Sequence, residues 1–372
     1  MFLSQYFTGF RKIDWTLIVT VLFLASFGLA AIYSVALGQG LGEFLNFKKQ
    51  LIWLVIGFGV MIFFANFDYY YWQRLGWVGY LFGFLLLILV LTPLGSTIRG
   101  TRGWFSLGGF SFQPVELMKI FMIIILADLY SRYSHTLHKI YHLIFIGLVV
   151  ALPLLLVILQ PDLGSAMVLF FTWFITFLFF TKNKWHIVLI VALMLMSFIV
   201  AWFFLFQDYQ RDRILTFIDP SLDPLGRGYN VHQSIIAVGA GRLFGRGLGF
   251  GSQSQLKFIP ESQTDFIFAV IAEELGFVGV IFIISFFGLI FYRMYKIVKG
   301  ARDDFGMFLV LLIMALIFVQ VFINIGMGVG LLPVTGISLP FVSYGGSFLV
   351  TAMMLLGIVL NIHKKSLISR KI

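Results

Sequence analysis

The chain has 372 residues, of which 60% are hydrophobic and 11% are charged, a balance that excludes an ordinary soluble protein. The net charge of +10 does not indicate nucleic-acid binding, because the basic residues lie between apolar runs rather than in one stripe. The absence of cysteine excludes disulfides, thiol catalysis and cysteine-bound metal. Long unbroken apolar runs favour membrane-spanning helices over a β-barrel.

Apolar runs of spanning length follow one another along the whole chain. The first follows Arg11 and Lys12, but it is a full span long and lacks a small-residue cleavage site, so we expect a retained helix. The sequence predicts an all-α, polytopic membrane protein with ten transmembrane helices in a single domain, 1–372. The predicted spans are 15–34, 49–67, 75–94, 113–131, 142–160, 164–181, 186–206, 266–292, 307–330 and 343–362.

The distribution of lysine and arginine between the spans predicts that both termini are cytoplasmic. With this orientation, the short outer loops hold only Lys48, Lys49, Arg99 and Arg102. The inner segments hold many more basic residues, namely Arg11, Lys12, Arg74, Arg132, Lys139, Lys182, Lys184, Arg293, Lys296, Lys299, Arg302, Lys364, Lys365, Arg370 and Lys371.

Two connections are long, 95–112 and 208–264, and both are predicted to lie on the outer face. Long loops in compact proteins usually carry function. The second loop mixes acidic and basic side chains, and its middle, 231–239, is apolar enough either to lie in the membrane interface or to dip back into the membrane. We expect 208–265 to be an extracytoplasmic catalytic loop.

Charged residues inside predicted spans are candidates for function, because each is costly in lipid unless it is paired or hydrated. Gln113, Glu116 and Lys119 lie near the outer end of the fourth span, where Glu116 and Lys119 share one helix face and can form an ion pair. The pair either holds helices together or, with Gln113, forms a polar wall of a substrate cavity.

Asp162, Glu273 and Glu274 are further acidic candidates at or within predicted spans. Asp162 precedes the sixth span, where it either caps the helix or binds substrate. Glu273 and Glu274 lie too deep in the eighth span to reach bulk water, so at least one of them is expected to face the interior of the bundle.

Asp265 lies where the long outer loop enters the eighth span. Either Asp265 caps this helix, or Thr264 does so one residue earlier and leaves Asp265 to face a substrate at the membrane surface. The helix dipole favours an ionised carboxylate at this position, and a general base must be ionised.

The glycine-rich stretch 239–251 lacks the Gly-Lys-Ser/Thr ending of a P-loop and follows no predicted strand, so an ATP site is not supported. Its two arginines, Arg242 and Arg246, either meet phosphates at the membrane surface or are ordinary interfacial charges.

Six colinear motifs resemble those of the SEDS family, which includes RodA and FtsW. They are 113–119 (Gln-Pro-Val-Glu-Leu-Met-Lys), 160–164 (Gln-Pro-Asp-Leu-Gly), 219–229, 260–268 (Pro-Glu-Ser-Gln-Thr-Asp-Phe-Ile-Phe), 272–276 (Ala-Glu-Glu-Leu-Gly) and 339–347. Any one of these motifs is weak, but six in order over nearly the whole chain are specific. The short amino terminus and the Ala-Glu-Glu form are more similar to RodA than to FtsW.

The resemblance implies a peptidoglycan glycosyltransferase in the bacterial cytoplasmic (inner) membrane. Such an enzyme polymerises lipid II on the outer face, together with a class B penicillin-binding protein that crosslinks the strands. By the same resemblance Asp265 is the essential acidic residue, and Glu116 and Lys119 line the central cavity.

Three positions depart from the family pattern. Gly103 separates Arg102 from Trp104, which are adjacent in the family. Val115 stands where serine is common, and Gln263 stands where histidine is common. Because of Gly103, no family role is carried over to Arg102. Neither of the other two changes removes a charged group that the chemistry needs.

The expected mechanism is a single inverting displacement, with Asp265 as the general base for the attacking sugar hydroxyl. Cations must stabilise the departing pyrophosphate, and the loop offers Arg211, Arg213, Arg242, Arg246 and Lys257. No cofactor is required, although a divalent cation could share this work.

The buried charges also allow another class of function, a transporter that moves lipid-linked sugars across the membrane. A division polymerase similar to FtsW, or a polymerase of another prenyl-linked polysaccharide, would have the same architecture. The concentration of polar residues in the two outer loops favours extracytoplasmic chemistry over transport.

Overall fold

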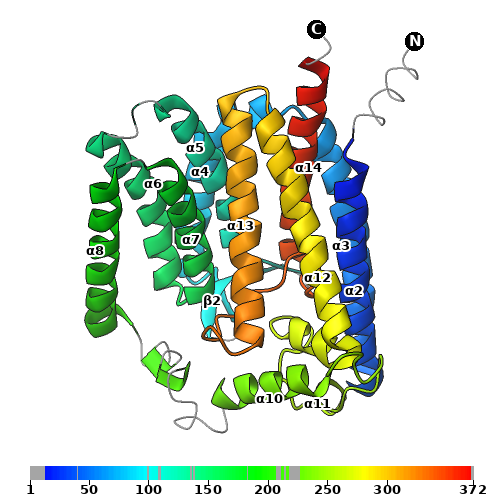
Figure 1. The fold of residues 1–372 in the computed structure, drawn as a ribbon. Coiled ribbons are helices and arrows are strands. Elements are labelled where there is room, and N and C mark those ends of the chain that lie inside the picture. The colour runs from blue at the N-terminus through cyan, green and yellow to red at the C-terminus, as the bar shows by residue number, and fades with distance from the viewer. Residues whose placement is uncertain are drawn as a thin grey trace.

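The computed structural model describes residues 13–39, 41–98, 100–107, 110–134, 136, 139–181, 183–206, 211–212, 215–217 and 227–369. The described residues form ten long helices, which lie at the ten predicted positions and make one bundle (Figure 1). They are α2 (Trp15–Gln39), α3 (Leu41–Asn66), α4 (Tyr69–Leu91), α5 (Pro114–Tyr133), α6 (Ile140–Leu159), α7 (Leu163–Phe180), α8 (Lys184–Val200), α12 (Ile267–Gly300), α13 (Asp304–Gly328) and α14 (Gly346–Ser369).

Nine of these helices are long and apolar enough to span a membrane by themselves. The exception is α5, which carries Glu116, Lys119, Asp128 and Arg132. This helix packs against α4, α6, α13 and α14, and most of its residues are buried. Glu116, Lys119 and Asp128 are buried and are therefore shielded from lipid by neighbouring helices, as polar groups at membrane depth must be. Arg132 is exposed near the end of the helix, where it pairs with Asp128.

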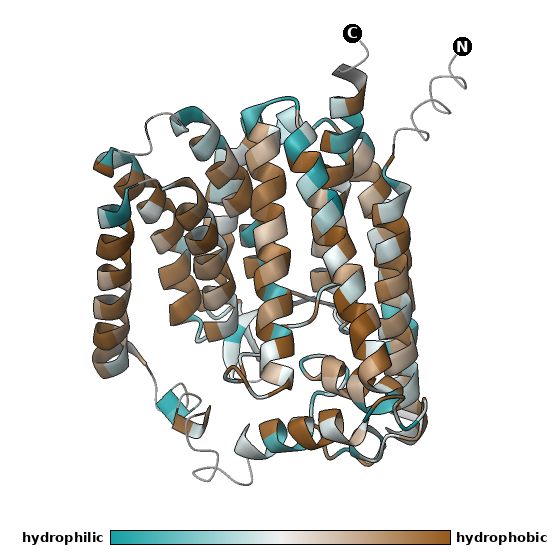
Figure 2. Cartoon of the chain, viewed as in Figure 1, coloured by the Kyte–Doolittle hydropathy of each residue, from teal (hydrophilic) through white to brown (hydrophobic). Residues whose placement is uncertain are grey.

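Apolar side chains cover the sides of the bundle, whereas hydrophilic residues gather near its two ends (Figure 2). The helix α8 stands at one edge and is extended by a π-helical turn, η1 (Ala201–Leu205). None of its spanning window is buried, so lipid is its expected surrounding on most sides.

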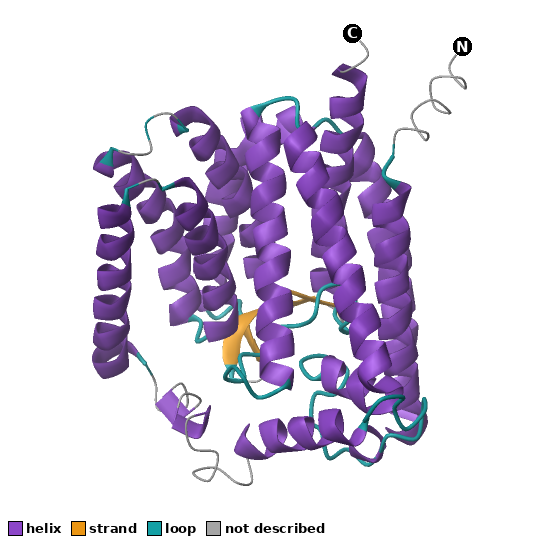
Figure 3. Ribbon diagram, in the orientation of Figure 1, coloured by secondary structure: helices purple, strands orange, loops and turns teal. Residues whose placement is uncertain are grey.

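The two ends of the bundle differ in their connections (Figure 3). At one end, here called the loop end, lie the short strands β1 (Ser96–Ile98), β2 (Thr101–Leu107) and β3 (Phe110–Phe112) and the helices α10 (Arg227–Ala240) and α11 (Ser252–Gln255). At the opposite, terminal end, α2 begins and α14 ends.

The small antiparallel sheet, in the order β1-β2-β3, was not predicted and occupies the first long connection. The amphipathic helix α10 contains the apolar stretch 231–239 and lies across the ends of α12 and α13 (Figure 1). Ala237 is fully buried there, and the hydroxyl of Ser234 donates to the carbonyl of Gly328 at 2.6 Å. This orientation agrees with the prediction that the stretch lies along the membrane interface.

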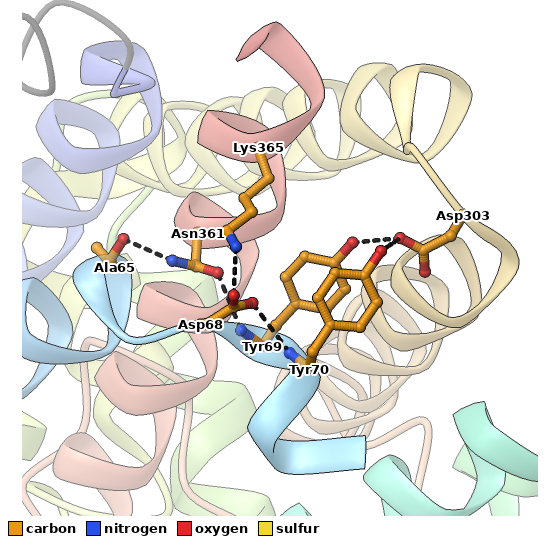
Figure 4. A network of polar contacts seen from close by, with 7 residues as sticks. All are labelled: Ala65, Asp68, Tyr69, Tyr70, Asp303, Asn361 and Lys365. Atoms are coloured by element: carbon orange, nitrogen blue, oxygen red, sulfur yellow. Dashed lines mark hydrogen bonds and ion pairs between the residues drawn. The ribbon is translucent and has the colours of Figure 1, made fainter. Parts of the chain in front are cut away.

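A polar network joins the helix ends at the terminal end (Figure 4). The hydroxyls of Tyr69 and Tyr70 both donate to Asp303, whose other oxygen accepts the amide of Gly306 at the start of α13. Asn361 accepts the amide of Tyr69 at 3.1 Å and donates to the carbonyl of Ala65 at 3.0 Å. The network thus ties α14 to the turn between α3 and α4, and ties that turn to α13.

Candidate active site

Asp265 is half-buried and precedes α12 by two residues. The N-cap residue of α12 is Phe266, which makes no side-chain capping bond, so both predicted caps, Asp265 and Thr264, are wrong. The hydroxyl of Thr264 donates instead to the carbonyl and carboxylate of Glu261, at 3.3 and 3.1 Å. The reason is a local turn after Pro260, in which the amides of Thr264 and Phe266 both donate to the carbonyl of Glu261, so the helix begins later.

The backbone around Asp265 is fixed by side chains from distant parts of the chain. Asn324 of α13 donates to the carbonyl of Asp265 at 2.9 Å, and the hydroxyl of Ser343 donates to the carbonyl of Thr264 at 2.6 Å. The Oδ2 atom of Asp265 lies 3.6 Å from the position that a Cβ on Gly336 would take. The carboxylate therefore faces the loop between α13 and α14 at a residue with no side chain.

The first residues of α12 form a buried half-helix. Every residue from 266 to 274 is at most 2% exposed, so this segment is surrounded by protein on all faces. At Gly276 the backbone leaves helical geometry, with φ 64° and ψ −162°, and the helix continues beyond it to Gly300. Asp265 therefore stands at the start of a short helical segment that is set apart from the rest of α12.

The glycine-rich segment inserts its backbone into this break in α12. A break in a helix frees amide and carbonyl groups, which need partners when they are buried. Four hydrogen bonds join the segment to α12. Before the break, the amides of Arg246 and Gly247 donate to the carbonyls of Glu273 and Glu274. After the break, the amides of Phe277 and Val278 donate to the carbonyls of Arg242 and Leu243.

Close backbone approach explains the glycines at this junction. A Cβ on Gly241 would lie 1.8 Å from the carbonyl oxygen of Ala272, and a Cβ on Gly245 would lie 2.1 Å from that of Glu274. Both distances are too short for a real Cβ atom, so the loop backbone and the α12 backbone can approach this closely only where the loop has glycine. Packing on α12 thus requires glycine at positions 241 and 245.

Glu273 and Glu274 are buried, as predicted, and both carboxylates hold the long loop in place. Glu273 accepts the amides of Gln253 and Ser254, at 2.8 and 3.0 Å, at the start of α11. Glu274 accepts the hydroxyl of Ser34 from α2. These bonds connect the loop, the half-helix and α2 into one unit.

Asp162 and Gln113 meet at the loop end. Gln113 donates to Asp162 at 3.0 Å, and Asp162 accepts the amide and hydroxyl of Ser165, at 2.9 and 2.8 Å. The prediction that Asp162 caps the helix is confirmed. The start of α7 also touches the loop that carries Gly336, because a Cβ on Gly164 would lie 2.4 Å from the carbonyl oxygen of Thr335.

Glu116 and Lys119 form the predicted ion pair, with 2.6 Å between Nζ and Oε1. Both side chains are almost completely buried, and Lys119 also lies 6.0 Å from the centre of the Phe348 ring of α14. The second carboxylate oxygen of Glu116 has no partner among the described atoms. It remains available to a ligand or to water in the interior.

The predicted loop cations do not form one cluster in the described part of the chain. Arg211 donates to the carbonyls of Trp202 and Phe203, at 3.0 and 3.3 Å, beside α8. Arg242 and Arg246 lie on the opposite side of the bundle, against α12 (Figure 1). Lys257 is exposed, and Arg213 falls outside the described residues.

Several other predicted features also fall outside the described residues. They are most of the motif 219–229 and the basic residues Arg11, Lys12, Arg99, Lys182, Arg370 and Lys371.

Arg102, whose family role was doubtful because of the inserted Gly103, has a structural bond. Its guanidinium donates to the carbonyl of Thr92 at 3.0 Å, at the end of α4. Asn324 and Ser343 were not predicted as site residues. The signal for Asn324 was available, since it is one of two amide side chains, with Gln320, in an otherwise apolar span, and polar residues there are candidates for function.

The fold and this site define a polytopic helical membrane protein with a carboxylate site at the loop end of its bundle. The chain belongs to the FtsW/RodA/SpoVE family, whose model, described as cell cycle protein, matches residues 14–367.

Relatives of known name match nearly the whole chain. The peptidoglycan glycosyltransferase MrdB of Escherichia coli (strain K12) is 36% identical over 353 residues, covering 94% of this chain and 93% of MrdB. Stage V sporulation protein E of Bacillus subtilis (strain 168) is 38% identical over 365 residues, covering 95% of this chain and 97% of that protein.

Solved structures have the same fold. A chain from a peptidoglycan synthase complex that coordinates polymerization and crosslinking superposes with a TM-score of 0.80 at 29% identity, covering 95% of this chain and 98% of that one. The rod shape determining protein RodA of Thermus thermophilus gives a TM-score of 0.71 at 26% identity, covering 95% and 97%.

Proposed function

We propose that this protein is a peptidoglycan glycosyltransferase that polymerises lipid II. The observation that carries the proposal is the position of Asp265, half-buried at the start of a buried half-helix and facing Gly336, in a chain of the FtsW/RodA/SpoVE family. Relatives named peptidoglycan glycosyltransferase, which match nearly the whole chain, support this activity.

The loop end of the bundle faces outward in this proposal, and both termini are cytoplasmic. Basic residues near the terminal end support this orientation, among them Arg293, Arg302, Lys364 and Lys365. The activated donor then needs no ATP on the outer face, because lipid II carries its sugar on a pyrophosphate. The protein has to orient the reactants and stabilise charge.

Asp265 acts as the general base of a single displacement. It takes the proton from the 4-hydroxyl of the terminal GlcNAc of one lipid II, the acceptor, while the hydroxyl oxygen bonds to the anomeric carbon of the growing chain, the donor. The bond from that carbon to the pyrophosphate oxygen breaks, and its electron pair leaves with the prenyl pyrophosphate. The α-linked donor thus becomes a β-linked glycan with inversion.

Other polar groups of the site serve the substrate rather than the proton transfer. The Glu116–Lys119 pair, and Gln113 with Asp162, form a polar wall for the sugars or phosphates. The departing pyrophosphate is assigned to the loop cations Arg211, Arg213 and Lys257. A divalent cation would also serve there, although the described residues contain no group of three His, Asp or Glu side chains that could hold one.

A class B penicillin-binding protein is the proposed partner, and elongation of the rod is the proposed cellular role. Support for the partner comes from the similar chain that was solved within a peptidoglycan synthase complex. Support for elongation comes from the similarity to MrdB and RodA, and division by an FtsW-like enzyme is the alternative.

Purified protein in liposomes, given labelled lipid II with and without a cognate class B penicillin-binding protein, tests the activity. We expect glycan ladders from the wild type and none from Asp265→Asn. The control Asp304→Asn removes an exposed carboxylate at the terminal end and should leave the ladders intact. Lipid II that crosses the bilayer without ladders would instead identify a transporter.

A further inference from the structure

The glycine-rich segment forms a hollow of about 540 Å³ lined by residues 240–246. The backbone of this segment is hydrogen-bonded to α12 on either side of the Gly276 break, so the residues that line the hollow are held in place. The side chains of the hollow differ from those of the Asp265 site, although both features lie along the same half-helix of α12.

Two guanidinium groups border the hollow. The side chain of Arg242 is exposed and makes no hydrogen bond or ion pair with any described residue, whereas Arg246 donates to the hydroxyl of Ser252 at 3.2 Å. The nearby carboxylates of Glu273 and Glu274 accept bonds from the α11 amides and from Ser34. The arginines therefore keep most of their donors for an anionic ligand, and guanidinium groups match phosphate oxygens well.

Backbone strain at Arg242 points to a role for its side chain. Its φ of 47° lies in the left-handed region, which glycine adopts at lower cost. The other residues of this segment with positive φ, at positions 245, 247 and 249, are all glycines. Strain of this kind is retained where surrounding structure imposes it, often at ligand sites.

The hollow also borders an exposed apolar surface. Leu243 and Phe244 are 61% and 80% exposed, and the amides of Phe277 and Val278, on the exposed face of α12, bond to this turn of the loop. A ligand that fits both features has a phosphate or pyrophosphate head group and a hydrocarbon chain. A lipid-linked phosphate has this chemistry.

The distance from Asp265 indicates which lipid-linked phosphate is bound. The amide of Arg246 bonds to Glu273, eight residues after Asp265, so at 1.5 Å per residue the half-helix separates the two points by about 12 Å. In the acceptor, the attacking hydroxyl and the pyrophosphate lie at opposite ends of a disaccharide. In the donor, the pyrophosphate is attached directly to the reacting carbon.

We infer that Arg242 and Arg246 bind the pyrophosphate of the acceptor lipid, while its far sugar hydroxyl reaches Asp265. This inference rests on the proposed polymerase function. The half-helix 267–275 then fixes the distance between the two ends of the bound acceptor. The arginines serve acceptor binding rather than the departing pyrophosphate of the donor.

The test compares two acceptors that cannot act as donors. One is lipid II with a methylene group in place of the anomeric oxygen, and the other carries the same disaccharide-peptide on a prenyl ether without phosphates. Labelled lipid II, at a low fixed concentration, is the donor. The variant is Arg242→Gln with Arg246→Gln, and the control Lys299→Gln removes an exposed charge from the far end of α12.

We expect the double variant to raise the KM of the pyrophosphate acceptor by about tenfold or more, since each lost charge-assisted bond is worth about that factor. Its kcat/KM with the phosphate-free acceptor should stay within about twofold of the wild-type value. The variant Arg242→Lys with Arg246→Lys keeps both charges and should raise the KM less. It also provides the comparison if the glutamine variant does not fold.

Three results would overturn the inference. They are equal losses with both acceptors, a change confined to the KM of the donor, and a loss that depends only on anionic phospholipid in the vesicles, which would assign the arginines to bulk lipid. A wild type that makes no glycan from any acceptor would refute the proposed function itself.

Discussion

The side-chain amide of Asn324 donates to the backbone carbonyl of Asp265 at 2.9 Å, and the same nitrogen donates to the carbonyl of Ile337 at 2.7 Å. One buried amide in α13 thus joins the start of the half-helix to the loop that carries Gly336. It fixes the backbone on both sides of the space that the Asp265 carboxylate faces.

Replacing Asn324 with leucine should therefore lower kcat and leave KM nearly unchanged. A displacement of the base by about 1 Å is enough to lower the rate by about 100-fold. The bond reaches the backbone rather than the carboxylate, so the acid limb of the pH–rate profile should keep its position. Steady-state kinetics with lipid II over a range of pH measures both.

The matched control for Asn324→Leu is Thr335→Val, which removes a buried hydroxyl that has no partner among the described atoms. Activity and thermal stability should stay near wild type, because no hydrogen bond is lost. An Asn324→Leu protein with normal kcat would show that the contact does not position Asp265.

The Glu116–Lys119 pair gives a second prediction. Lys119→Met leaves Glu116 as a buried charge without its partner, which should cost about 3–5 kcal/mol of stability. Glu116→Gln combined with Lys119→Met removes both charges and should recover most of that loss. Thermal unfolding in detergent of the two single variants and the double variant measures the coupling.

The same double variant separates the two interpretations of this pair. If the pair forms a wall of the substrate site, the variant should be stable and at least about tenfold less active, because contacts to the bound substrate are lost. Wild-type polymerisation by a stable double variant would leave the pair a purely structural role.

The contact of the glycine-rich segment with α12 gives a third prediction. Gly245→Ala should lower the free energy of unfolding by several kcal/mol or prevent folding. The new Cβ would overlap a carbonyl of α12, and residue 245 has a φ of 78°, which alanine rarely adopts. Gly239→Ala is the control, because it lies in α10 with no atom within 4 Å of the new Cβ, and there alanine should stabilise by about 0.5–1 kcal/mol. Equal stability of the two variants would contradict this account of the segment.

Apolar run length was sufficient to predict the ten long helices, because lipid requires every backbone group to be bonded within its own segment. The pairing of Glu116 with Lys119 followed from helical spacing, and the cap at Asp162 followed from its position before a span. These features depend on neighbouring residues, so a single sequence contains them.

Features that depend on distant residues could not be predicted in this way. The backbone groups freed by the helix break at Gly276 are hydrogen-bonded by a loop about thirty residues earlier in the sequence. Asn324 donates to the carbonyl of Asp265, which lies 59 residues earlier. The N-cap of α12 was predicted wrongly because the turn after Pro260 takes up the hydroxyl of Thr264. The small sheet was missed because its strands are only three to seven residues long.

The polar network at the terminal end should support stability without contributing to the chemistry. Asn361 is buried and makes two hydrogen bonds to the turn between α3 and α4, so Asn361→Leu leaves an amide and a carbonyl without partners and should cost about 2–5 kcal/mol. The control Lys364→Gln alters an exposed contact with Asn66 and should change stability by less than about 1 kcal/mol. At a temperature where both variants are folded, the kcat for lipid II should equal that of the wild type, because the site lies at the other end of the bundle. A loss of kcat in folded Asn361→Leu protein, with normal extraction and gel filtration, would show instead that the two ends of the bundle are coupled.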